Sequence, residues 1–220
     1  MWCTSTRRLS QLPSHLLSVA GANVYPVSVV RDLGVFIDSD LGAATHVRRT
    51  VSRCFGALRQ LRHLRQYVTG RSLVVSLIHS RPHYGNFILV WLPAYLQRHL
   101  QSVLNAAARL VFRLRRYDPS QMLLQPFTGC VYLKRVDFKV AVMAFRVLHG
   151  LAPSYLDQLV RVADLSGRHR LRSSTSQLLH IPGYRLTTVG RRSFPVAASV
   201  IWNSLHPAVQ SSALSVFANV

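Results

Sequence analysis

The fold is decided by residues 96–116, which read LQRHLQSVLNAAARLVFRLRR. The apolar residues of this stretch recur at intervals of three and four, as on one side of an α-helix; they are Leu96, Leu100, Val103, Leu104, Ala107, Leu110, Val111 and Leu114. At about 100° per residue they occupy one arc about 120° wide. The opposite side holds Arg98, Arg109, Arg113 and Arg116, with Phe112 close by. We therefore predict a long helix with a buried face and a cationic stripe, which is either a solvated face or a surface that follows a nucleic-acid backbone.

The charge balance narrows the choice of partners. The 220 residues include 27 Lys and Arg against 7 acidic residues, all Asp, and the formal net charge is +20. Lys134 and Lys139 are the only lysines. Because guanidinium groups bind phosphate in planar, bidentate pairs, this Arg-dominated excess favours nucleic acid. A membrane surface is a less favoured partner, because no single short segment combines the charge with a strong lipid-facing stripe.

The chain begins with β-strand patterns. Two or three short strands separated by turns are expected within residues 1–30. Residues 32–38, DLGVFID, are expected to form a further strand, and Gly34 inside it indicates a close backbone approach. The alternate carboxylates of Asp38 and Asp40 resemble a catalytic pair, but without a third acidic residue they are expected to form a turn.

Helical spacing dominates the rest of the chain. It predicts helices over residues 46–61, with Thr45 as the N-cap and Arg49 and Arg53 opposite the apolar face, and over residues 71–80. A further helix over residues 134–149 is apolar on two sides, as in the centre of a bundle.

Beyond residue 149 shorter elements are expected. Gly150 is expected at the C′ position of the preceding helix, and a short helix should run from Pro153 to Val160. Strands are expected at residues 178–181 and 185–189, and a helix near the end of residues 191–203.

The sequence contains no convincing catalytic centre. Cys3, Cys54 and Cys130 are far apart and have no His or Cys at ligand spacing, so neither a zinc site nor a disulfide framework is predicted. No phosphate-binding loop and no nucleophile elbow is present. We therefore predict a chain that is not an enzyme, with no catalytic residues, no metal site, no cofactor and no small-molecule substrate.

An ordered series of short blocks resembles the C-terminal part of the reverse transcriptase of LINE-type non-LTR retrotransposons. The blocks are VRDLGVFIDSDL (30–41), YGN (84–86), LP (92–93), LQSVLNAAARL (100–110), FK (138–139), LHGLAPSYL (148–156), LRSS (171–174), GRRSFPVAA (190–198) and IWNSL (201–205). Together they extend over nearly the whole chain, and their order and spacing carry the similarity.

The resemblance implies an architecture. The Leu-Gly-Val stretch would close the palm, the helices that follow would form the thumb, and the catalytic aspartates of the family would lie ahead of this region. The expected fold is mainly α: residues 1–42 as a small β remnant of the palm, 43–165 as a thumb-like helical bundle, and 166–220 as a basic loop and mixed C-terminal segment. Relative to the family, both ends look truncated.

The same resemblance implies a non-catalytic role in binding the backbone of a template–primer duplex, and a nuclear location. The residues expected to contact RNA or DNA are Arg49, Arg53, Arg98, Arg109, Arg113 and Arg116, with Phe112 stacking on a base. Two alternatives stay open: a basic helical module of a host protein that docks an acidic partner, and a degenerate product without function.

Overall fold

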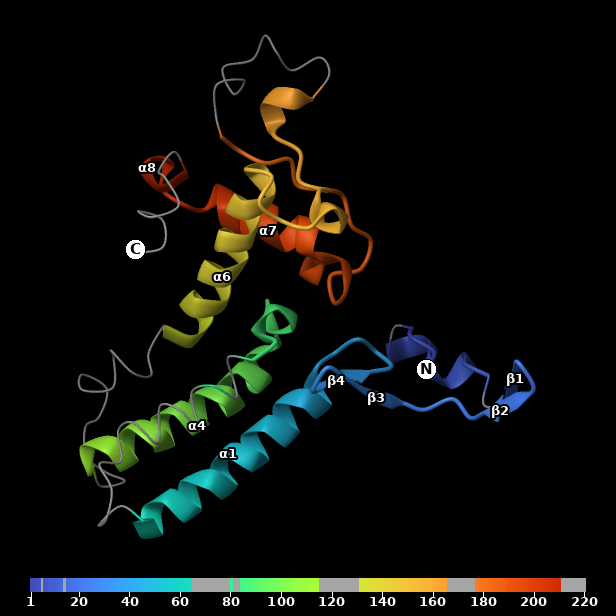
Figure 1. Cartoon of the computed structure of the whole chain (residues 1–220), viewed down its shortest axis with the longest axis vertical. Helices are drawn as coiled ribbons and strands as arrows, with labels where there is room; N and C mark the ends of the chain where they lie inside the picture. Colours follow the sequence, from blue (N-terminus) through green and yellow to red (C-terminus); the bar gives the residue numbers. More distant parts are fainter. Residues whose placement is uncertain are drawn as a thin grey trace. The chain divides into compact units, whose positions relative to one another are not determined.

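The computed structural model describes residues 1–4, 6–13, 15–64, 80, 84–114, 131–165 and 177–210. The chain divides into two compact units, Met1–Tyr132 and Leu133–Val220. It is mainly helical, as predicted, with two small antiparallel sheets near its beginning (Figure 1). Apart from Ser80, the helix predicted over residues 71–80 lies outside the described residues.

Two β-hairpins follow a 3₁₀ helix, η1 (Thr6–Gln11), at the start of the first unit. Strand β1 (Leu17–Val19) pairs with β2 (Ala22–Val24), and β3 (Val29–Asp32) pairs with β4 (Val35–Asp38). The single strand predicted over residues 32–38 is therefore wrong. Leu33 and Gly34 form a two-residue turn with φ angles of 44° and 84°, and positive φ at both positions suits a tight hairpin.

Helix α1 (Ala44–Leu64) starts directly after the second hairpin. Thr45, predicted as the N-cap, lies inside the helix, and its backbone N–H donates to Oδ2 of Asp38 at 3.0 Å. Asp40 acts locally as well, because its Oδ1 accepts the N–H of Gly42 at 2.8 Å. Both carboxylates thus hold the turn between β4 and α1, as the sequence predicted.

Helix α4 (Ala94–Phe112) follows the 3₁₀ turn η3 (Asn86–Leu89) and packs on α1. The two helices run side by side in the same direction (Figure 1). Their common core contains Cys54, Leu58, Leu61, Val103 and Ala107, each at most 7% exposed. The predicted apolar face of α4 is confirmed, since Leu96, Leu100 and Leu104 are buried as well.

The end of α4 differs from the prediction. The helix stops at Phe112 because Arg113 adopts the left-handed conformation, with φ 56° and ψ 31°. The N–H of Leu114 then returns to the carbonyl of Arg109 at 3.1 Å. Arg116 lies outside the described residues. The continuous helix to residue 116 is therefore wrong.

In the second unit, helix α6 (Val131–Leu148) ends where the sequence predicted. Gly150 has φ 67° and donates to the carbonyl of Val147, while Leu151 donates to the carbonyl of Arg146. These two bonds form a Schellman motif with Gly150 at C′. All but the first two residues of this helix belong to the second unit.

The remaining elements are short. They are η4 (Ser154–Leu156), η5 (Val162–Asp164), η7 (Gly190–Arg192), α7 (Phe194–Asn203) and α8 (Pro207–Gln210). The helix expected from Pro153 to Val160 is thus a single 3₁₀ turn, whereas the helix expected within residues 191–203 is confirmed as α7. Neither strand predicted within residues 178–189 forms, and this part of the described chain contributes one bridge, Leu179 with Arg161.

Candidate nucleic-acid interface

Three arginines converge on the ring of Phe36, which lies on β4 and is 7% exposed. Arg31 is the register partner of Phe36 on β3, and its Cζ atom lies 5.8 Å from the ring centroid. Arg49 and Arg53, one turn apart on α1, place their Cζ atoms 4.3 and 5.9 Å from the same centroid. We call Arg31, Arg49, Arg53 and Phe36 the arginine cluster.

The arginine cluster has an excess of positive charge. The face of an aromatic ring attracts a cation by about 0.5–1 kcal/mol at an exposed site, which helps to hold the guanidinium groups together. All three arginines are exposed. Within the described part of the chain, neither Arg31 nor Arg49 is paired with a carboxylate. The cluster can therefore accept the negative charge of a ligand.

His46 is a buried residue that contacts the backbone of the arginine cluster. Its side chain is 5% exposed, and its Nδ1 accepts the backbone N–H of Phe36 at 3.4 Å. Burial lowers the pKa of His46 below its usual 6.5; Asp38 opposes this effect, and Arg53 adds to it. A neutral imidazole at neutral pH keeps the bond to Phe36, so the positive charge of the site comes from the guanidinium groups.

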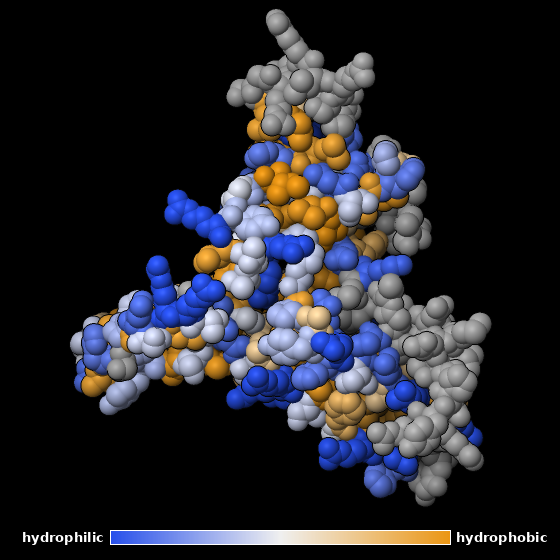
Figure 2. Space-filling model, turned by 180° about the vertical axis from the view of Figure 1, so that it is seen from behind, coloured by the Kyte–Doolittle hydropathy of each residue, from blue (hydrophilic) through white to orange (hydrophobic). Residues whose placement is uncertain are grey.

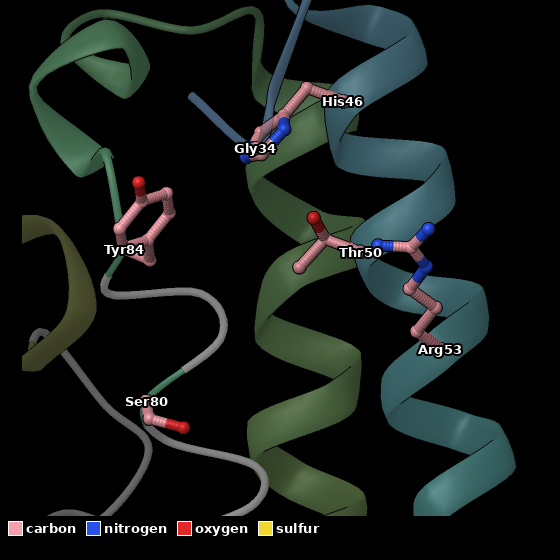
Figure 3. A pocket seen from close by; sticks show the side chains of 6 residues that line it. All are labelled: Gly34, His46, Thr50, Arg53, Ser80 and Tyr84. Atoms are coloured by element: carbon pink, nitrogen blue, oxygen red, sulfur yellow. The ribbon is translucent and has the colours of Figure 1, made fainter. Parts of the chain in front are cut away.

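A pocket of about 630 Å³ lies beside Arg53. It is lined by Gly34, His46, Thr50, Arg53, Ser80 and Tyr84 (Figure 3). The lining combines hydroxyl groups, an imidazole, a guanidinium and an aromatic ring. Arg53 belongs both to this pocket and to the arginine cluster, so the two form one continuous site.

The structure brings the two predicted arginines of α1 together in one site and leaves the predicted residues of α4 outside it. Arg49 and Arg53, which the sequence pattern places opposite the apolar face of α1, both lie in the arginine cluster. Arg31 was missed, because its place beside Phe36 depends on the register of the β3–β4 hairpin, whereas the sequence pattern indicates one strand there. A two-residue turn at Leu33-Gly34, had it been recognised, would have placed Arg31 opposite Phe36.

The predicted stripe on α4 is not one continuous solvated face. Arg98 is exposed, and its Nε donates to the carbonyl of Ala94 at 3.3 Å. Arg109 is only partly exposed, and its Nε is buried without a hydrogen-bond partner. Arg113 has left the helical register, and Arg116 lies outside the described residues. Phe112, at the last turn, is 38% exposed.

Within the described ranges, no three His, Cys, Asp or Glu side chains lie close enough together to hold a metal ion. The helices of these ranges include none with the length and apolar character of a membrane span. Comparison with protein-family models, curated proteins and solved structures found no match. The resemblance to reverse transcriptases thus rests on the sequence blocks alone.

Proposed function

We propose that this chain binds the backbone of nucleic acid through the arginine cluster and catalyses no reaction itself. The observation that carries the proposal is the convergence of three exposed guanidinium groups, from two different elements, on one buried ring. Each guanidinium presents a planar fork of donors that matches a phosphate. Such contacts ignore base sequence, because every nucleotide has the same phosphate.

The architecture that we propose is the end of a palm followed by a thumb, as in non-LTR reverse transcriptases. Two features support it: the hairpin that contains the Leu-Gly-Val block precedes the helices, and α1 and α4 pack against each other directly after it. In that family the catalytic aspartates belong to a preceding region. A role in holding nucleic acid, rather than in transferring nucleotides, follows from this position.

Binding to two blunt DNA duplexes of unrelated sequence tests the proposal. We expect equal affinity for both, and about a fivefold loss for Arg49→Ala at physiological salt, since one phosphate contact disappears. Arg146→Ala, which removes an exposed arginine from the second unit, is the matched control and should leave affinity nearly unchanged. Fluorescence anisotropy with labelled duplexes measures all three proteins.

Two results would contradict this function. If Arg49→Ala and Arg146→Ala bind with the same affinity, the arginine cluster has no special role. If polyglutamate displaces the duplex at lower charge concentration than a second duplex does, the cluster is a docking site for an acidic polypeptide, which is the host-module alternative.

A further inference from the structure

Tyr84 is an exposed aromatic ring that the protein holds in place. Its hydroxyl donates to the carbonyl of Leu33, in the turn between β3 and β4. Its ring lies against Gly34, where an added Cβ would come within 3.3 Å of Cε1. The side chain is nevertheless 57% exposed. An oriented ring that stays accessible can bind a flat partner at small entropic cost.

Polar groups face this ring from helix α1. Figure 3 shows Tyr84 across the pocket from Thr50 and Arg53. Thr50 supplies a hydroxyl and Arg53 a guanidinium, and both groups are hydrogen-bond donors of the kind that phosphate oxygens accept. The pocket therefore joins an aromatic platform to an anion-binding wall, which are the two elements that bind single-stranded nucleic acid.

The volume of the pocket sets the size of the ligand. About 630 Å³ lies within the range of pockets that take ligands as large as a nucleotide. A base inside a duplex is stacked on both faces by its neighbours and paired along one edge, so its ring face cannot reach Tyr84. We infer that this pocket takes one unpaired nucleotide of a single strand, its base stacked on Tyr84 and its phosphate held by Arg53.

This inference rests on the proposed function and adds that the pocket binds single-stranded nucleic acid. The test measures the affinity of each variant for a short single-stranded oligothymidylate and for a blunt duplex. Tyr84→Leu should lower the single-strand affinity about 5- to 150-fold, the range for losing one stacked base, and leave duplex affinity unchanged. Tyr84→Phe keeps the ring and should bind the single strand nearly as the wild type does.

The matched control is Tyr95→Leu, which removes another exposed tyrosine from the first unit and should change neither affinity. Since both Tyr84 variants lose the hydroxyl bond to Leu33, a fault in folding would affect them alike. A strand that carries iodouracil gives a direct reading, because irradiation should crosslink it to Tyr84, identified by mass spectrometry.

The outcomes separate the two proposals. Equal losses for single strand and duplex in Tyr84→Leu, or a crosslink only to other residues, would overturn the pocket inference. Unchanged single-strand binding in Tyr84→Leu, together with weakened binding of both forms in Arg49→Ala, would overturn it and leave the proposed function standing. If Arg49→Ala leaves both affinities unchanged, the proposed function fails.

Discussion

The side-chain amide of Asn203 bonds to backbone groups of Leu179 as a neighbouring strand would. Its Oδ1 accepts the N–H of Leu179 at 2.8 Å, and its Nδ2 donates to the carbonyl of the same residue at 2.9 Å. On the other side of this segment, the N–H of His180 donates to the carbonyl of Val160. The backbone N–H and carbonyl of Leu179 are thus both bonded by one side-chain amide, on the side of the segment that faces away from the bridge with Arg161.

Removing this amide should destabilise the second unit. Asn203→Ala leaves two backbone groups of a residue that is 1% exposed without partners, and we expect a loss of about 2 kcal/mol in the free energy of unfolding. Urea unfolding followed by tryptophan fluorescence measures it. Thr187→Ala, at an exposed position of the same unit, is the control. Equal stability of the two variants would show that Asn203 does not hold Leu179.

At the scale of single residues, the sequence predicted those positions that depend only on the periodicity of one helix. Arg49 and Arg53 follow from the period of α1 alone. Arg31 depends on which residue faces it across a hairpin, and a shift of one position would have placed it on the other face. Tyr84 depends on the approach of two segments about fifty positions apart, which no local pattern encodes.

The ends of helices show the same distinction between local and non-local information. The end of α6 was predicted correctly, because glycine at C′ adopts positive φ without strain and marks the stop in the sequence. The end of α4 was not, because Arg113 takes the left-handed conformation without being glycine. Arginine is a good helix former, so an arginine at position 113 favours continuation of the helix rather than its end.

A substitution at Gly150 tests the role of its conformation. At φ 67°, and with no atom within 4 Å of an added Cβ, Gly150→Ala changes only the backbone strain. We expect a loss of about 1 kcal/mol in stability. Gly183→Ala also meets no atom within 4 Å, has no positive φ, and should be neutral or slightly stabilising. Thermal unfolding of both variants measures the difference, and equal melting temperatures would refute the strain argument.

For the whole molecule, the mainly helical class was predicted correctly, whereas the grouping of the helices into one thumb-like bundle stays a prediction. Periodicity shows which face of a helix is apolar, but not which other helix covers it. The apolar faces of α1 and α4 cover each other. In the second unit, the ring of Phe145 on α6 lies 6.4 Å from that of Trp202 on α7. Partner choice of this kind arises only when distant segments meet.

The net charge of +20 offers a competing explanation for any binding of nucleic acid. Hydrophilic side chains, blue in Figure 2, are spread over the visible face of the chain rather than gathered in one place. Charge of this kind attracts any polyanion without a defined site. The arginine cluster must therefore be distinguished from the charge of the whole chain.

The salt dependence of duplex binding in two triple variants makes this distinction. One variant replaces Arg31, Arg49 and Arg53 by Ala, and the other replaces Arg146, Arg185 and Arg191, three exposed arginines of the second unit, so that both lose the same charge. At about 0.9 per phosphate contact, we predict that the cluster variant lowers the log–log salt slope by about 2.7, with helicity retained by circular dichroism. The control variant should keep nearly the wild-type slope. Equal slopes in the two variants would contradict the account, because net charge alone would then explain the binding.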